Sequence, residues 1–135
     1  MSRSTLHIRK DVGILIIRVA IGASMLAFHG IPKLMMGPSN WEKVGAAMHK
    51  IGITFATSFW GFAAVAAECV GAILIMIGLF TRPAALVLAF TMLIAFISHL
   101  AKGDTLAVAS HPLELLFIFL ALAVTGAGKY SLDRK

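Results

Sequence analysis

Four long apolar runs dominate this sequence and restrict what it can fold into. They cover about residues 12–36, 54–80, 83–100 and 112–127. An α-helix needs about 20 mostly apolar residues to cross a bilayer. Because lipid offers no partner for unpaired backbone groups, such runs must be helical. The sequence therefore predicts an all-α fold, a four-helix transmembrane bundle that forms a single integral membrane domain over residues 1–135 and contacts the lipid bilayer.

Composition supports a lipid environment. Hydrophobic residues make up 59% of the chain and charged residues only 13%, with a mean hydropathy of +0.92. A soluble protein of this size needs more polar surface. The formal charge of +6 lies mainly at the ends of the apolar runs, which indicates membrane topology and not nucleic-acid binding. The single cysteine, Cys69, excludes an internal disulfide and is expected to pack inertly.

The distribution of Lys and Arg predicts the orientation. The side with the N-terminus, the second turn and the C-terminal tail carries seven basic residues, and the opposite side carries four: Arg3, Arg9, Lys10, Arg82, Lys129, Arg134 and Lys135 against Lys33, Lys43, Lys50 and Lys102. Basic residues are enriched in cytoplasmic segments. Both termini are therefore predicted to be cytoplasmic.

The more polar segment between the first two runs, residues 37–52, predicts a short amphipathic helix in the first external loop. Trp41, Val44, Met48 and Ile51 recur there at three- and four-residue spacing, as on one face of a helix. Such a helix would either lie at the membrane interface or cap the bundle. The sequence leaves both interpretations open.

Prolines mark the expected helix boundaries. Pro32 is expected to kink the first helix or end it early. The short turn at Thr81-Arg82-Pro83 predicts an antiparallel hairpin of the second and third helices. Pro112 is expected in the first turn of the fourth helix, after a loop that opens at Lys102.

Two ionisable residues inside the apolar runs, Arg18 and Glu68, stand out. A charge at the bilayer centre costs roughly 2.5–3.5 kcal/mol on the insertion scale, so each charge needs a partner, water or a function. Helical rise puts Arg18 about 25 Å and Glu68 about 21 Å inward from the external surface. Similar depth predicts a buried Arg18–Glu68 ion pair. This pair could serve only to fix helix packing, or Glu68 could accept protons or contact a ligand in a cavity.

A candidate ligand pocket extends outward from this pair. His29 and Lys33 share a helical face with Arg18. His99, at the end of the third run, and Glu114, at the start of the fourth, belong to the same end of the bundle. These four residues could line a pocket with Arg18 and Glu68 at its floor. No spacing matches a metal site, a phosphate loop or a nucleophile motif, so no metal, built-in cofactor or catalytic residue is assigned.

Six fragments in order resemble the DoxX family of small membrane proteins: Arg18, His29-Gly30-Ile31-Pro32-Lys33, Glu68-Cys69-Val70-Gly71, Gly78-Leu79-Phe80-Thr81-Arg82, His99 and Gly128-Lys129-Tyr130-Ser131-Leu132-Asp133. The resemblance covers nearly the whole chain. Gly126-Ala127-Gly128 departs slightly from the Gly-Pro-Gly-like turn that is common in the family. The resemblance implies a four-helix inner-membrane protein linked to redox metabolism. One branch of the family is similar to the small subunit of a thiosulfate:quinone oxidoreductase. Other members are associated with superoxide dismutase and sulfurtransferase partners, or with resistance to quinones and thiol stress.

The favoured hypothesis is a subunit that binds a quinone-like small molecule in a redox or thiol/oxidative-stress system. His29 and Glu68 would bond the ligand's oxygens, while Arg18 and Lys33 would stabilise negative charge. The sequence contains no haem-ligand pair, flavin motif or dithiol to carry electrons. We therefore expect a non-autonomous subunit of a quinone-linked oxidoreductase, with a soluble or membrane redox partner on the cytoplasmic side.

Two other hypotheses stay open. The basic pocket could belong to a carrier or channel for a small anion, such as an oxoanion of sulfur. Alternatively, the chain could be a membrane anchor that recruits soluble redox enzymes through its basic ends, including Arg134 and Lys135. The small residues of the second run could build internal helix contacts or the face of a homodimer.

Overall fold

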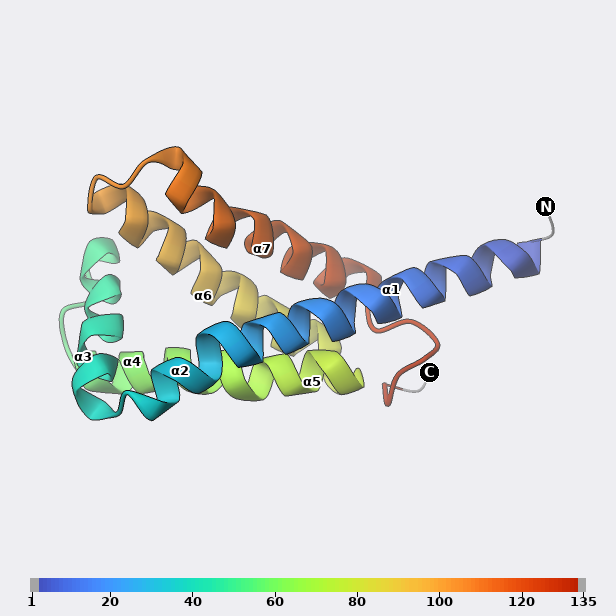
Figure 1. Ribbon diagram of the computed structural model, residues 1–135, viewed down its shortest axis with the longest axis horizontal. Helices are drawn as coiled ribbons and strands as arrows, with labels where there is room; N and C mark the ends of the chain where they lie inside the picture. The colour runs from blue at the N-terminus through green and yellow to red at the C-terminus, as the bar shows by residue number, and fades with distance from the viewer. Residues whose placement is uncertain (1–2, 134–135) are drawn as a thin grey trace.

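The computed structural model describes residues 3–133 and is built from helices (Figure 1). Four of them are long and apolar enough to cross a membrane: Thr5–Met35, Thr57–Ile77, Thr81–Ala101 and Leu106–Thr125. Within residues 3–133 no strand is present. The predicted all-α four-helix transmembrane bundle is confirmed.

The first spanning helix consists of α1 (Arg3–Met25), a π-helical turn η1 (Leu26–Gly30) and α2 (Ile31–Met35). In the π turn the N–H of Ile31 donates to the carbonyl of Leu26, five residues back. The widened turn comes just before Pro32, whose ring would clash with the carbonyl four residues back in a regular helix. The helix therefore continues past the proline to Met35 and does not end early.

The loop between the first two spanning helices folds as α3 (Pro38–Gly45) and a 3₁₀ helix, η2 (Ala46–Ile51). This segment crosses one end of the bundle (Figure 1), where it packs against α4 and α6. Gly45 lies against the carbonyl of Thr57, and Gly61 lies against the carbonyl of Trp41, with no room for a side chain at either glycine. Of the two interpretations of the amphipathic segment, capping of the bundle fits this packing.

The second spanning helix consists of α4 (Thr57–Ala66), a second π turn η3 (Ala67–Gly71) and α5 (Ala72–Ile77). It ends at Gly78, whose φ of 69° is the left-handed conformation that glycine adopts most easily. Helix α6 (Thr81–Ala101) follows at once and runs back along the bundle. The predicted hairpin is therefore formed.

Helix α7 (Leu106–Thr125) begins six residues before Pro112, so the expected placement of Pro112 in the first turn is wrong. Thr105 has extended backbone angles, and the N–H groups of Val108 and Ala109 both donate to its carbonyl. Leu106 to Ala109 favour a helix, and Pro112 removes only one intrahelical hydrogen bond. This local preference moves the start of the helix.

The core lies between the four spanning helices. Met25, Ile75, Leu88, Phe119 and Leu122 are nearly or fully buried there. Large apolar side chains on the outside, among them Phe28, Phe117 and Val124, are exposed, as expected for surfaces that face lipid. The ends of α1 and α7 that lead to the two termini lie at the same end of the bundle (Figure 1).

Candidate functional site

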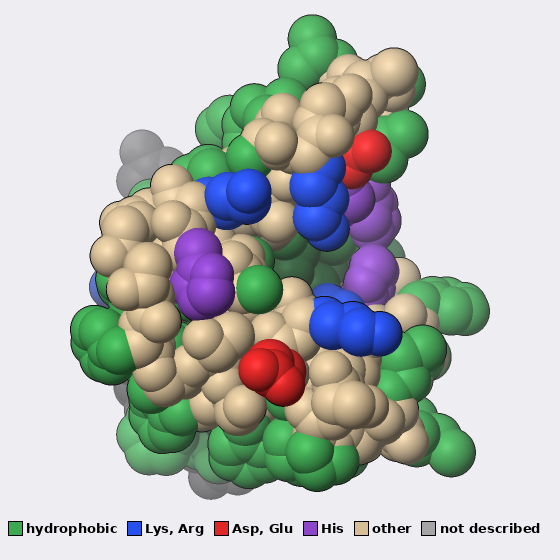
Figure 2. All heavy atoms as spheres, turned by 90° about the vertical axis from the view of Figure 1, so that its left-hand side faces the viewer, with side chains coloured by type: hydrophobic (Ala, Val, Ile, Leu, Met, Phe, Trp, Pro, Cys, Tyr) green, Lys and Arg blue, Asp and Glu red, His purple; other side chains and the backbone are tan. Residues whose placement is uncertain are grey.

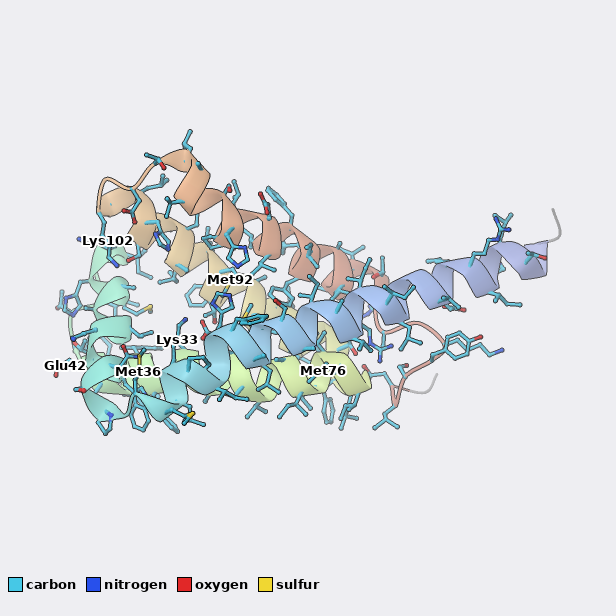
Figure 3. All side chains as sticks on the ribbon, viewed as in Figure 1. Lys33, Met36, Glu42, Met76, Met92 and Lys102 are labelled. Carbon is cyan, nitrogen blue, oxygen red and sulfur yellow. The ribbon has the colours of Figure 1, made fainter. Side chains whose placement is uncertain are left out.

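A buried ion pair joins the first and second spanning helices. The ammonium group of Lys33 donates to both carboxylate oxygens of Glu68, at 2.7 and 2.9 Å. The Glu68 side chain is 2% exposed and that of Lys33 is 31% exposed. Figure 3 shows Lys33 pointing from its helix toward the bundle interior. The carboxylate is therefore sealed between the helices, while the ammonium is accessible from one side.

The pair lies where the two π turns meet. Gly30, at the end of η1, packs against Cys69 of η3, and a Cβ atom on Gly30 would lie 2.8 Å from the sulfur and 3.2 Å from the backbone nitrogen of Cys69. Only glycine allows this close approach of the two helices. The contact brings α2 beside Glu68. π-helical turns occur often at functional sites, which makes this junction a candidate site.

The ion pair predicted between Arg18 and Glu68 is wrong: Glu68 pairs with Lys33. The prediction measured depth inward from the ends of the two helices and assumed that the ends are level. Because Gly30 lies against Cys69, the second helix extends farther toward α3 than the first does. Arg18 is 12 residues from Gly30, about 18 Å along the helix.

Arg18 is bonded instead to four backbone carbonyls. Its guanidinium donates to Ile75 at 2.9 Å and Met76 at 3.0 Å, and to Ala127 at 2.6 Å and Tyr130 at 2.9 Å. The first two carbonyls belong to the last turn of α5, where a helix has unpaired acceptors and a partial negative charge. Arg18 is 1% exposed, and its hydrogen bonds connect α1 to the end of α5 and to the segment after α7. It therefore has a structural role and does not form the floor of a pocket.

The segment after α7 completes this connection. The carboxylate of Asp133 accepts hydrogen bonds from the N–H groups of Phe80 and Thr81, both at 2.7 Å, at the start of α6. The N–H of Asp133 donates to the carbonyl of Gly78 at 2.7 Å. A side chain on Gly78 would collide with Arg18 and Ser131. The family-like fragments 78–82 and 128–133 are thus two sides of one joint, which we call the C-terminal joint.

The C-terminal joint predicts a pH-dependent stability. Burial raises the pKa of Asp133, but the hydrogen bonds from Thr81 and Phe80 and the charge of Arg18 outweigh it and hold this pKa below its ordinary value. A carboxyl group with a lowered pKa stabilises the fold at pH values above its unfolded pKa of about 3.9, and this stabilisation is lost as the pH falls through the folded pKa.

We expect Asp133→Asn to be about 1 kcal/mol less stable than wild type at pH 7, and we expect this difference to shrink as the pH falls below about 3.9. Thermal unfolding of both proteins at pH 7, 5, 4 and 3 checks this. A constant difference in melting temperature across that range would contradict it.

The remaining candidates are dispersed over the end of the bundle that α3 crosses (Figure 1). His29 stacks on His111 of α7, with 3.3 Å between their Nε2 atoms, and His99 contacts Asp104 of the following loop at 2.7 Å. Glu114 is exposed on α7. Figure 2, which looks onto this end, shows basic, acidic and histidine side chains around a hollow. The single pocket predicted from all six residues is therefore not assembled.

A cavity of about 230 Å³ begins at the ion pair and runs between α4 and α6. It lies beneath α3 and η2, which together we call the capping segment. Its walls are almost entirely apolar. Its lining residues are Lys33, Val44, Ala47, Met48, Trp60, Ala63, Ala64, Ala67, Glu68, Val87, Phe90, Thr91, Ile94 and Ala95. Val87 and Phe90 are 52% and 50% exposed on the surface of a spanning helix, so the cavity borders the lipid.

Sequence reasoning found two residues of this cavity, Lys33 and Glu68, but gave them different partners. It missed the apolar walls, because alanine, valine and phenylalanine are ordinary residues in a spanning helix. It also did not predict the contact between His29 and His111. The C-terminal joint was indicated in part, because fragment 128–133 is one of the fragments that resemble the family.

The comparisons with known proteins agree with the helical architecture. The family model described as DoxX matches residues 13–101, which is more than half of the chain. The match includes Arg18, the π turns and the Lys33–Glu68 pair. No curated protein and no solved structure matches the sequence. From its sequence match and its four spanning helices, this chain belongs to the DoxX family.

Proposed function

We propose that this membrane protein binds a small, neutral, lipid-soluble molecule of the quinone type in the cavity beside Lys33 and Glu68. It would act as the membrane subunit of a redox or thiol/oxidative-stress system. The observation that carries the proposal is a cavity that borders lipid along its walls and ends at a buried ion pair.

The cavity's size and walls favour a compact ring. Pockets for drug-sized ligands measure about 300–1,000 Å³, and this cavity, at about 230 Å³, is slightly smaller. Its walls carry Ala63, Ala64 and Ala67 on one side and Phe90 on the other, with Trp60 at the capping segment. Apolar walls with a few polar groups at one end are typical of sites for lipophilic ligands.

The polar end can orient a ligand's oxygen. An ammonium group has three N–H donors, and the two contacts to Glu68 leave the third for a carbonyl oxygen in the cavity. The Glu68 carboxylate balances the charge of Lys33, so the site attracts neutral molecules more than anions. Arg18 already donates four of its five N–H groups to backbone carbonyls. These contacts support the quinone-type ligand over the anion carrier.

Electrons would have to come from the ligand or from a partner protein. We propose that both termini are on the cytoplasmic side of the inner membrane, since the ends of α1 and α7 that lead to them lie at the same end of the bundle (Figure 1) and basic residues are more numerous there. The anchor hypothesis depends on Arg134 and Lys135, which lie outside the described residues.

Binding of duroquinone, a one-ring quinone, tests the proposal. Trp60 lines the cavity, so a bound quinone should quench its fluorescence. We expect saturable quenching in the purified wild type. Ala64→Leu, which fills part of the cavity and leaves both charges in place, should weaken binding at least tenfold. Ala121→Leu on the exposed face of α7 is the matched control and should bind normally. Absence of saturation in the wild type, or equal binding by both variants, would overturn the proposal.

A further inference from the structure

We propose that a second hollow, at the end of the bundle opposite the capping segment, binds a phosphate group, and that a phospholipid supplies it. The hollow measures about 800 Å³ and lies where α6 begins and α7 ends. It is lined by the side chains of Arg82 and Lys129, by Asp11 and Asp133, and by Phe80 and Pro83 among others. This inference is independent of the quinone site.

Two cations provide the attraction. Arg82 lies in the first turn of α6 and Lys129 just beyond the end of α7, and both are exposed. Among residues 3–133 neither forms a salt bridge. A guanidinium group presents paired N–H donors to phosphate oxygens, and an ammonium adds a mobile point charge. The two side chains border one hollow from different segments, so one phosphate can contact both.

The two carboxylates of the hollow do not cancel this attraction. Asp133 is bonded to two N–H groups at the start of α6, and Asp11 accepts the N–H of Lys129 at 3.2 Å. The guanidinium of Arg18 packs against Gly78 in the C-terminal joint. Counting Arg18, Arg82 and Lys129 against the two aspartates leaves one net positive charge. A phosphodiester carries one negative charge, which balances it.

The position of the hollow favours a lipid over free phosphate. The spanning helices α6 and α7 reach their limits at Thr81 and Thr125, and both residues line the hollow. It therefore lies at the height of lipid headgroups. Phe80 and Pro83, both exposed, offer apolar surface for the first part of an acyl chain. A headgroup here would link α6 to the segment that follows α7.

Native mass spectrometry and thermal unfolding of the detergent-purified protein test the proposal. The probes are phosphatidylglycerol, phosphatidylcholine with the same chains, and inorganic phosphate. We expect phosphatidylglycerol to bind one to one and to raise the melting temperature more than phosphatidylcholine does. The double variant Arg82→Gln/Lys129→Gln should bind it at least tenfold more weakly. Lys43→Gln/Lys50→Gln removes the same charge from exposed residues at the opposite end and should bind like wild type.

The three probes separate the sources of the phosphate group. Protection by phosphatidylglycerol that is lost only in the Arg82/Lys129 variant assigns the hollow to a lipid headgroup. Protection by inorganic phosphate alone, lost in the same variant, supports the phosphate site and overturns its lipid source. Equal binding of both lipids, or equal losses in the two double variants, overturns the site itself.

Discussion

Replacing Arg18 with methionine should destabilise the protein strongly. Methionine has a similar length but no donor, so four buried or partly buried carbonyls lose the hydrogen bonds that they now accept from the guanidinium, although the carbonyl of Ile75 also accepts from the N–H of Gly78. A buried polar group without a partner costs about 1–3 kcal/mol, and some of these carbonyls can shift toward water. We expect a loss of about 4 kcal/mol in the free energy of unfolding.

Denaturant unfolding in detergent micelles measures this loss. Arg9→Met is the matched control, because Arg9 is an exposed arginine of α1 outside the C-terminal joint and its loss should change the free energy of unfolding by less than about 0.5 kcal/mol. Arg18→Lys should fall between the two, since a lysine keeps the charge but has three donors in place of the fork of five. If Arg18→Met unfolds at the wild-type midpoint, Arg18 does not hold the C-terminal joint together.

The second large effect concerns the buried ion pair, and we expect it to be unequal for its two partners. Lys33→Met leaves the Glu68 carboxylate, which is 2% exposed, uncompensated between the helices. Breaking a buried pair in this way costs about 3–5 kcal/mol. Glu68→Gln leaves Lys33, which is 31% exposed and flexible enough to turn its ammonium toward water. We expect that variant to lose about half as much stability.

The double variant Lys33→Met/Glu68→Met serves as the control. It removes both charges and should recover most of the stability lost in Lys33→Met, because apolar residues of similar volume replace buried pairs at little cost. It should still fail to bind duroquinone, since no donor is left at the end of the cavity. Equal losses in the two single variants, or a double variant that is as unstable as their sum, would contradict a coupled pair.

The spanning helices could be predicted because their signal is local. Apolar runs of sufficient length have one structural solution in lipid, and Thr81-Arg82-Pro83 marked the turn between the second and third helices. The start of α7 was misplaced because helix-favouring residues before Pro112 outweighed the proline. The apolar runs therefore predicted the individual helices, but they did not predict how one helix packs against another.

The partner of Glu68 could not be predicted because it depends on register between helices. Counting 1.5 Å per residue places a side chain along its own helix, but the relative offset of two helices is set by contacts such as Gly30 on Cys69. The π turns also rotate the residues that follow them, and no sequence pattern marks η3. The resemblance of fragment 128–133 to the family indicates that this segment has a role. It does not show that a backbone carbonyl of the segment, that of Tyr130, accepts a hydrogen bond from Arg18.

The four bonds of Arg18 also set an order in which the protein can mature during synthesis. The carbonyls of Ala127 and Tyr130 lie 109 and 112 residues after Arg18 in the chain. At about 5–20 residues per second, the arginine waits roughly 5–20 s after its own synthesis for them. Until then an inserted helix carries a charge whose partners are incomplete, which is unfavourable in lipid. A chain that stops before residue 127 therefore leaves Arg18 with only the carbonyls of Ile75 and Met76 among its four partners.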